Sequence, residues 1–288
     1  MRLEATITMR TFAAHTLRGR LNRAAVAMTA TVLLPAAAAA QDRRPEIGPS
    51  VLGEKYHAEI SGTLWNPALF GVISSEQFGM IGDDIDFVGD LGYKQTRFKD
   101  LRIVLRAGRK HRFRAQYTPV VYTADTTFSR NIIFNGQSFG VNVPVTSEFG
   151  WKVWRLGYEY DFLYKSRGFL GVLLEGRVTE FSASLASPLR DPEFVLAKAP
   201  LPALGLVGRV YVMREVAINM EVSGMRLPDI DPKYQASYFD WDIHGTVNLS
   251  NNVGVQVGWR RMSTFLVIDR DKGDVKFQGM WFGGAVRY

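Results

Sequence analysis

The residues of this sequence with the clearest capacity for chemistry are two aspartates and a histidine spaced two residues apart. Asp240, Asp242 and His244 share one face of an alternating apolar–polar segment. A carboxylate that orients an imidazole can activate water or a hydroxyl group for hydrolysis. Residues two apart are neighbours on any β-strand, however, so this spacing predicts proximity rather than catalysis. We expect no enzymatic activity, and the alternative is a hydrolase of lipid or peptide that uses these three residues.

Arginines and carboxylates follow the same two-residue spacing along most of the chain. They occupy one face of successive segments whose other face is apolar, which is the periodicity of β-strands. We predict that they face a common interior and pair there, because an unpaired buried charge is very costly. This predicted lumen charge network consists of Glu59, Arg102, Arg106, Arg112, Arg114, Arg155, Glu159, Asp161, Glu175, Arg177, Arg209, Glu221, Asp240, Asp242, His244, Arg260 and Arg287.

Ten segments with this alternation must position those side chains. They span residues 54–65, 98–107, 111–123, 150–164, 169–180, 202–213, 216–227, 235–249, 253–267 and 274–288. Their connections alternate between turns of a few residues and longer loops, at residues 66–97, 124–149, 181–201, 228–234 and 268–273.

A sheet can cross hydrocarbon only if it closes, because every backbone hydrogen bond must then be made internally. Short turns at one end and long loops at the other are typical of membrane barrels. The pattern therefore predicts an all-β fold, a closed antiparallel up-and-down transmembrane β-barrel of about ten strands. Eight strands would result if the first hairpin lies outside the wall, and twelve if residues 132–145 add a pair.

The first long connection is too apolar for a solvated loop. It contains the runs at residues 68–73 and 78–82. We predict that it folds over or into the barrel mouth as a lid, or that it extends the wall. Residues 131–139 are also apolar, and we expect them to pack against it.

The first 40 residues predict a cleaved signal peptide. Five arginines precede an alanine-rich run that ends in Ala38-Ala39-Ala40, just before Gln41. The alternative is an uncleaved anchor helix, but the run contains Pro35 and is shorter than the roughly 20 apolar residues of a membrane span. Without these 40 residues, which carry five Arg and one Glu, the net charge falls from +7 to +3.

The composition excludes several classes of protein. The 288 residues include no cysteine, which excludes disulfides, thiolate zinc sites and thiol nucleophiles. A mean hydropathy of −0.05 excludes a polytopic helical membrane protein, but a barrel averages its two faces to such a value. Basic runs with interleaved aromatic residues do not occur after residue 40, so nucleic acid is not an expected partner. We expect no cofactor and no metal.

Aromatic residues near the segment ends favour a membrane barrel over a secreted soluble β-protein, whose alternation would look the same. Interfacial girdles at the two ends are typical of such barrels. The expected short-turn girdle contains Tyr56, Phe162, Phe169 and Tyr288, and the opposite one contains Trp65, Trp154, Phe239, Trp241 and Phe265.

The last segment ends in an alternating run in which Phe282, Val286 and Tyr288 share one face. This resembles the assembly signal of bacterial outer-membrane barrels. With the signal peptide and the paired strands, the chain resembles the small bacterial outer-membrane β-barrel superfamily, which includes OmpA-like and OmpW-like barrels. The resemblance is architectural and covers nearly all of residues 54–288.

This resemblance implies a barrel domain at residues 54–288 in the outer membrane of a Gram-negative-type cell, after a periplasmic leader at residues 41–53. The implied route of export runs through the periplasm. The expected partners are outer-membrane lipid and lipopolysaccharide, periplasmic chaperones and the barrel-insertion machinery. The expected role is structural, surface-interacting or narrow-pore passive transport.

Overall fold

The computed structural model describes residues 51–76, 80–188, 190–227 and 234–288, with the backbone alone at 190–199. These residues belong to one of the two units into which the chain divides, residues 47–288. The expected signal peptide, residues 1–40, and the leader up to residue 50 lie outside the described residues. Within the described ranges no helix is long and apolar enough to span a bilayer.

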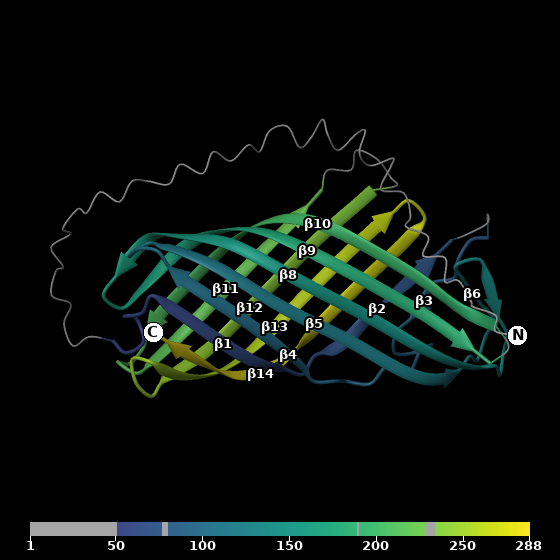
Figure 1. The fold of residues 1–288 in the computed structure, drawn as a ribbon, viewed down its shortest axis with the longest axis horizontal. Helices are drawn as coiled ribbons and strands as arrows, with labels where there is room; N and C mark the ends of the chain where they lie inside the picture. The colour runs from purple at the N-terminus through teal and green to yellow at the C-terminus, as the bar shows by residue number, and fades with distance from the viewer. Residues whose placement is uncertain (1–50, 77–79, 189, 228–233) are drawn as a thin grey trace, which may run out of the picture. The chain divides into compact units, whose positions relative to one another are not determined.

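The wall is one antiparallel sheet whose first and last strands pair with each other (Figure 1). This confirms the predicted closed all-β barrel, and ten strands form its ring. In ring order they are β1 (Ala58–Trp65), β4 (Phe98–Arg106), β5 (His111–Thr127), β8 (Pro144–Lys165), β9 (Gly168–Ser187), β10 (Arg190–Tyr211), β11 (Val216–Arg226), β12 (Tyr234–Asn248), β13 (Val253–Ile268) and β14 (Asp271–Arg287).

The two ends of the barrel differ. Tight turns at residues 107–110, 166–167, 212–215 and 249–252 lie at one end with the C-terminus, and we call this the turn end. The opposite lid end carries the short strands β6 (Ile132–Phe134) and β7 (Gln137–Phe139), seen on the right in Figure 1. Residues 80–97 and 128–143 form what we call the lid.

Several strands continue further toward the lid end than the sequence indicates. The prediction of a loop at residues 181–201 is wrong, because β9 and β10 stay paired up to Ser187 and Arg190. The predicted loop at 268–273 is reduced to a two-residue turn between Ile268 and Asp271. Backbone pairing does not depend on the apolar–polar alternation of side chains, so the hairpins continue beyond the segments that show it.

The first long connection also builds wall. β2 (Ala68–Ser75) continues the line of β1 along β14 in an unchanged register, and β3 (Ile85–Asp86) then pairs with β2. Gly71, at φ +135°, lies so close to β14 that an added Cβ would sit 1.9 Å from the Asp274 carbonyl oxygen. Only glycine fits this approach. Residues 68–75 therefore extend the wall, and the lid begins beyond them.

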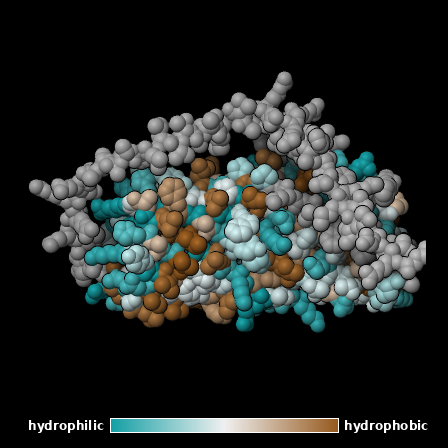
Figure 2. Space-filling model, viewed as in Figure 1, coloured by the Kyte–Doolittle hydropathy of each residue, from teal (hydrophilic) through white to brown (hydrophobic). Residues whose placement is uncertain are grey.

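The outer face of the wall is apolar around the whole ring. Every strand exposes a large hydrophobic side chain, between 42% and 65% accessible. On the face shown in Figure 2, hydrophobic residues gather over the middle of the wall and hydrophilic ones lie toward both ends. We call this band the apolar belt, and one member from each strand is Ile60, Leu105, Phe113, Leu156, Leu174, Leu206, Met220, Ile243, Val257 and Phe282.

The predicted position in an interfacial girdle is wrong for three aromatic residues. Tyr56 and Trp65 are buried inside the barrel, and the Phe169 ring lies inside too, 4.0 Å beneath the Arg112 guanidinium. Tyr56 precedes β1 and so escapes its alternation, whereas Trp65 has the inward parity of Glu59. Other expected aromatic residues do lie on the outer wall, Trp154 and Phe239 among them.

Candidate functional site

The seventeen residues of the predicted charge network all point into the barrel, toward its turn end. Thirteen are buried, and Arg102, Arg106, Arg114 and Arg209 keep side-chain exposures of only 10–18%. Each takes the inward parity of its strand, and closure brings these inward faces to one shared lumen. The strands thus bring together residues up to 228 positions apart, such as Glu59 and Arg287.

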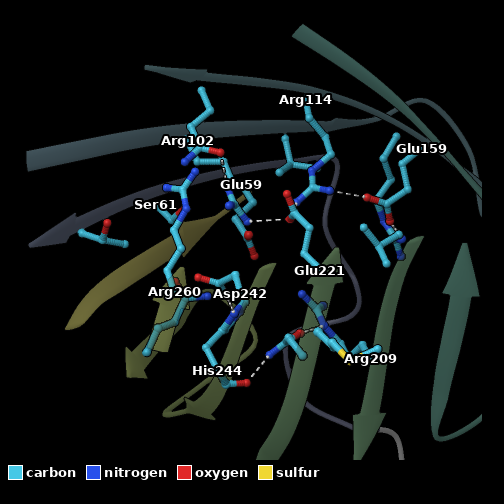
Figure 3. A pocket seen from close by; sticks show the side chains of 18 of the residues that line it. Glu59, Ser61, Arg102, Arg114, Glu159, Arg209, Glu221, Asp242, His244 and Arg260 are labelled. Carbon is cyan, nitrogen blue, oxygen red and sulfur yellow. Dashed lines mark hydrogen bonds and ion pairs between the residues drawn. The ribbon is translucent and has the colours of Figure 1, made fainter. Parts of the chain in front are cut away.

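Glu221 on β11 is the centre of one cluster. Its carboxylate lies 2.5 Å from Arg114 Nη2, 2.6 Å from Arg155 Nη2 and 3.4 Å from Arg102 Nη1. Arg114 also reaches Glu159, as Figure 3 shows, at 3.2 Å. These arginines come from β5, β8 and β4, so the ion pairs cross the lumen rather than follow the sheet.

Asp240 on β12 is the centre of a second cluster. Arg260 donates to both of its oxygens, at 2.7 and 3.1 Å, and the Tyr238 hydroxyl donates at 2.7 Å. Two-point arginine–carboxylate pairs of this kind are among the strongest charge-assisted contacts. Arg155 Nη1 lies 3.3 Å from Asp240, so this one side chain joins the two clusters.

A third group lies closer to the turn end. Arg112 donates to Glu159 and, at 2.5 Å, to Asp161. Arg287, the penultimate residue, donates to Glu59 and to the Asn248 side chain. These contacts tie the closing strand β14 to its neighbour β1 and, beyond β13, to β12.

Two carboxylates of the interior escaped sequence reasoning. Asp100 on β4 is 7% exposed and accepts hydrogen bonds from Gln116 and Thr118. It lies two residues before Arg102, so the alternation did carry a signal for it. Glu54 lies outside any strand, since β1 begins at Ala58 rather than at residue 54, and no periodicity points to it. With these two, nine carboxylates face the nine arginines of the network.

The imidazole of His244 is engaged within this interior. Its Nδ1 lies 2.6 Å from Asp242 Oδ1, and the other oxygen of Asp242 accepts a hydrogen bond from Trp281 Nε1 at 2.6 Å. The ring is 8% exposed and lines a cavity of about 70 Å³ that Arg260 and Glu221 also line (Figure 3). A cavity of this size holds a few water molecules, not an acyl chain or a peptide.

Candidate metal ligands are not gathered anywhere in the described part of the chain. No group of three or more His, Asp or Glu side chains there has the arrangement needed to hold a metal ion. The aspartates of the interior instead accept hydrogen bonds from arginine, tryptophan, tyrosine and glutamine side chains.

Aromatic side chains fill the lumen between the charged clusters and the lid end. Trp151 stacks between Phe277, at a ring distance of 4.7 Å, and Phe181, at 5.6 Å. Phe277 also contacts Tyr122 and Trp65, and all but Phe181 are at most 2% exposed. This aromatic plug occupies the lid-end half of the interior, which sequence alternation alone does not separate from the charged half.

The lid closes the same end. Phe87 is fully buried, with its ring 4.7 Å from that of Phe149 on the inner wall. The two halves of the lid are joined, because Asp83 N donates to Ile133 O at 2.9 Å and its carboxylate accepts from Ile133 N at 2.7 Å. The expected packing of residues 131–139 against the first connection is thus present in the structure.

Comparison with known proteins identifies the fold and no closer relationship. No protein-family model and no curated protein matches the chain. Among solved structures, the outer membrane protease OmpT from Escherichia coli is similar, with 9% identity, a TM-score of 0.50 and coverage of 80% of this chain and 96% of that one. The translocator domain of the autotransporter NalP from Neisseria meningitidis covers 80% and 88%, with 10% identity and a TM-score of 0.42.

The attachment invasion locus protein Ail of Yersinia pestis, solved with the heparin analogue sucrose octasulfate, has 11% identity and a TM-score of 0.35 over 80% of this chain and 98% of that one. At identities this low, a likeness concerns the fold alone. The chain has the closed antiparallel architecture of outer-membrane β-barrel proteins.

Proposed function

We propose that this chain is an integral outer-membrane β-barrel protein with a closed interior and a structural or surface-interacting role. The observation that carries the proposal is the inverted distribution of side chains in the barrel wall. Leu156 is 65% exposed and Leu174 is 48% exposed, whereas Glu159 and Arg177 are buried inside. A continuous apolar belt of this extent is unfavourable in water and favourable in contact with acyl chains.

A closed interior is supported by three successive fillings of the lumen: the lid, the aromatic plug and the ion pairs. Ten-stranded barrels are little wider than eight-stranded ones, whose side chains can fill the lumen completely. Narrow-pore passive transport is the alternative role. It would require the ion pairs and the aromatic plug to separate, and the contacts described above oppose such a separation.

Cationic side chains at the edge of the apolar belt that faces the lid end support lipopolysaccharide as a partner. Among the outward residues whose side chains the structure describes, the first polar one toward the lid end is basic on four strands and acidic on β9, where it is Glu180. Phosphate groups of a lipid headgroup would pair with these cations, with the acyl chains lying along the belt. The four residues are Lys99, Lys152, Arg226 and Arg261.

The exposed face of the C-terminal strand supports delivery by periplasmic chaperones and the barrel-insertion machinery. Phe282, Val286 and Tyr288 point outward, with 49%, 62% and 87% of their surface accessible. The same strand makes the pairing with β1 that closes the ring. Substituting Phe282 and Tyr288 by serine should therefore leave unfolded chain in the periplasm, as fractionation and protease sensitivity would show.

A surface-interacting role is supported by apolar residues on the lid. Ile81, Val88 and Val141 are 78%, 50% and 46% exposed, although neighbouring lid residues are fully buried. Exposed apolar side chains on a loop held by a rigid frame are a common basis of recognition.

Two measurements test the proposal. Cell fractionation with gel electrophoresis of unheated and boiled samples should show an outer-membrane protein whose mobility changes on heating. Recordings from planar bilayers that contain the purified protein should show no steady conductance. A protein that is a freely soluble monomer without detergent would contradict the membrane location. Stable single-channel currents would contradict the closed interior and favour narrow-pore transport.

A further inference from the structure

The segment just before the first strand crosses the turn end of the barrel. We call residues 51–57 the N-terminal strap. Leu52 N donates to Arg214 O at 2.9 Å, Gly53 N donates to the Asn251 side chain at 3.3 Å, and His57 N donates to Tyr288 O at 2.6 Å. These three partners belong to the β10–β11 turn, the β12–β13 turn and the C-terminus, so the strap is fastened at three places on the rim.

The strap directs one carboxylate into the lumen. Glu54 Oε1 lies 2.7 Å from Arg209 Nη1 and 3.1 Å from the Tyr211 hydroxyl. Its Oε2 lies 3.3 Å from the Tyr164 hydroxyl, 3.6 Å from an Arg106 nitrogen and 3.9 Å from an Arg112 nitrogen. We call the set Arg106, Arg112, Arg209, Tyr164 and Tyr211 the arginine cradle.

The cradle is a ready-made site for an anion. Its three guanidinium groups and two hydroxyls come from β4, β5, β8 and β10, and all converge on the two oxygens of one side chain. Among the described carboxylates, only Glu54 forms an ion pair within 4 Å of Arg106 or Arg209. Without it, two partly buried cations would have no close counter-charge, which is strongly unfavourable.

The electrostatics of Glu54 agree with this geometry. Burial acts to raise the pKa of its carboxyl, but the guanidinium groups of Arg209, Arg112 and Arg106 outweigh burial and hold the pKa below its usual value. Glu54 is therefore bound in its charged form at neutral pH, as a free carboxylate ligand would be.

We propose that the arginine cradle is a carboxylate-binding site that the N-terminal strap fills with Glu54 as an intramolecular ligand. The strap thereby acts as a stopper for the turn end. It is held by the charge of Glu54, by three hydrogen bonds that its N–H groups donate and by two that its carbonyl groups accept from Arg106. When the strap leaves, the cradle accepts a small carboxylate from solution. Only the location of this site rests on the proposed function: in an outer-membrane barrel, the cradle at the turn end faces the periplasm.

Chemical rescue tests the proposal in purified, detergent-folded protein, which requires no assumption about the membrane. Glu54→Ala should lower the midpoint of thermal unfolding, measured by heat-dependent gel mobility at pH 7. Acetate, compared with chloride at equal ionic strength, should raise the midpoint of this variant in a saturable manner, because a ligand of the folded state stabilises it. Wild type should not respond, since its cradle is filled.

Glu54→Gln is the matched control. It removes the charge but keeps the shape, so the cradle remains sterically occupied and acetate should have no effect. A saturable acetate effect of equal size in wild type, Glu54→Gln and Glu54→Ala would mean adventitious anion binding and would overturn the proposal, as would no acetate effect in Glu54→Ala. A parallel series with inorganic phosphate distinguishes carboxylate from general anion binding.

A second variant covers the case in which Glu54→Ala does not fold. Gly53 has φ +80°, and a Cβ there would lie 2.6 Å from Asn248 Oδ1 and 2.7 Å from Arg287 Nη1. Gly53→Ala should therefore displace the strap while Glu54 remains in the chain, and it should make the protein acetate-responsive. An unfolding midpoint that does not change with acetate in this variant would contradict the proposal. Outer-membrane fractionation tests the proposed function separately.

Discussion

Arg155 Nη2 lies 2.6 Å from Glu221 Oε1, although two strands separate β8 from β11 around the ring. The contact therefore spans the lumen and links two parts of the wall that share no backbone hydrogen bond. Arg155 also contacts Glu175 and Asp240, so one guanidinium holds three carboxylates from three strands. The charge of Arg155 is therefore neutralised by several partners rather than by one ion pair.

Glu221→Gln should strongly destabilise the barrel. In this variant Arg114 would still pair with Glu159, and Arg155 with Glu175. Among the described residues, however, Glu221 is the carboxylate that pairs with Arg102, so Arg102 would lose its counter-charge. Removal of one partner of a buried ion pair costs about 3–5 kcal/mol. Urea titration of the protein folded into lipid vesicles measures the loss. Adding Arg102→Met to Glu221→Gln should recover part of it, because the uncompensated cation is then gone.

A matched control for that experiment lies on the outer face. Glu180 faces Lys152 at 3.8 Å with both side chains more than a third exposed. Glu180→Gln should change stability by less than about 1 kcal/mol, as is usual for exposed pairs. Equal losses in the two carboxylate variants would argue against a buried network.

Leu156→Arg should impair membrane folding. Leu156 lies in the apolar belt of β8, between Tyr158 and Trp154, and is 65% exposed. An arginine on the lipid face near the middle of the bilayer costs about 2–4 kcal/mol. Thr123→Arg, at an exposed outward position of β5 beyond the belt, should be nearly neutral. The same urea titration compares them, and an unaffected Leu156→Arg protein would contradict the lipid contact.

Phe277→Ala should weaken the aromatic plug. Its side chain is fully buried and stacks on Trp151 at 4.7 Å, so its removal leaves an apolar cavity. A Phe→Ala substitution in a packed core costs about 3–5 kcal/mol. Phe239→Ala, on the outer face at 48% exposure, should cost much less in the same thermal gel-mobility assay. Equal midpoints for the two variants would show that the plug adds little stability.

Acid should loosen the lid through Asp90. Burial acts to raise the pKa of this carboxyl, but hydrogen bonds from the Arg130 side chain and the Asp86 backbone lower the pKa overall. A carboxyl whose pKa is lower in the folded state stabilises above its unfolded pKa, about 3.9, and loses that contribution as pH falls through the folded pKa. Arg130 is 43% exposed, so the effect stays below about 1 kcal/mol.

Limited proteolysis of whole cells measures this effect. Cleavage within the lid by an acid-active protease should increase as pH falls from about 4 to 2. Asp90→Asn should cleave readily at every pH in that range. A lid whose cleavage rate is the same in both proteins and does not vary with pH would contradict the role of Asp90.

His244→Gln should leave lipid A and peptide profiles of the cells unchanged. The imidazole is held by Asp242 beside a cavity that admits only a few water molecules. The amide keeps a hydrogen-bonding side chain there, so the barrel should also keep its heat-dependent mobility. Mass spectrometry of lipid A and of secreted peptides provides the check. Loss of a cleavage product in this variant would revive the hydrolase alternative.

The two-residue alternation predicted about ten strands, the inward direction of the seventeen network residues and the apolar outer face. These predictions succeeded because successive side chains of any β-strand point to opposite faces. Arg102 and Leu101 therefore lie on opposite faces whatever surrounds them. The same rule misplaced Tyr56, which precedes its strand. It also underestimated the length of the β9–β10 hairpin, because the outward residues of β9 change to Ser182 and Ser184 there.

The amino-acid sequence is enough to predict an antiparallel barrel with a charged interior. The folded barrel is needed to show which arginine meets which carboxylate, how the aromatic plug and the lid divide the lumen, and that Glu54 belongs to the interior. Those contacts join strands that are not adjacent, and they depend on barrel closure, shear and side-chain packing across the lumen. None of these is encoded in the periodicity of a single segment.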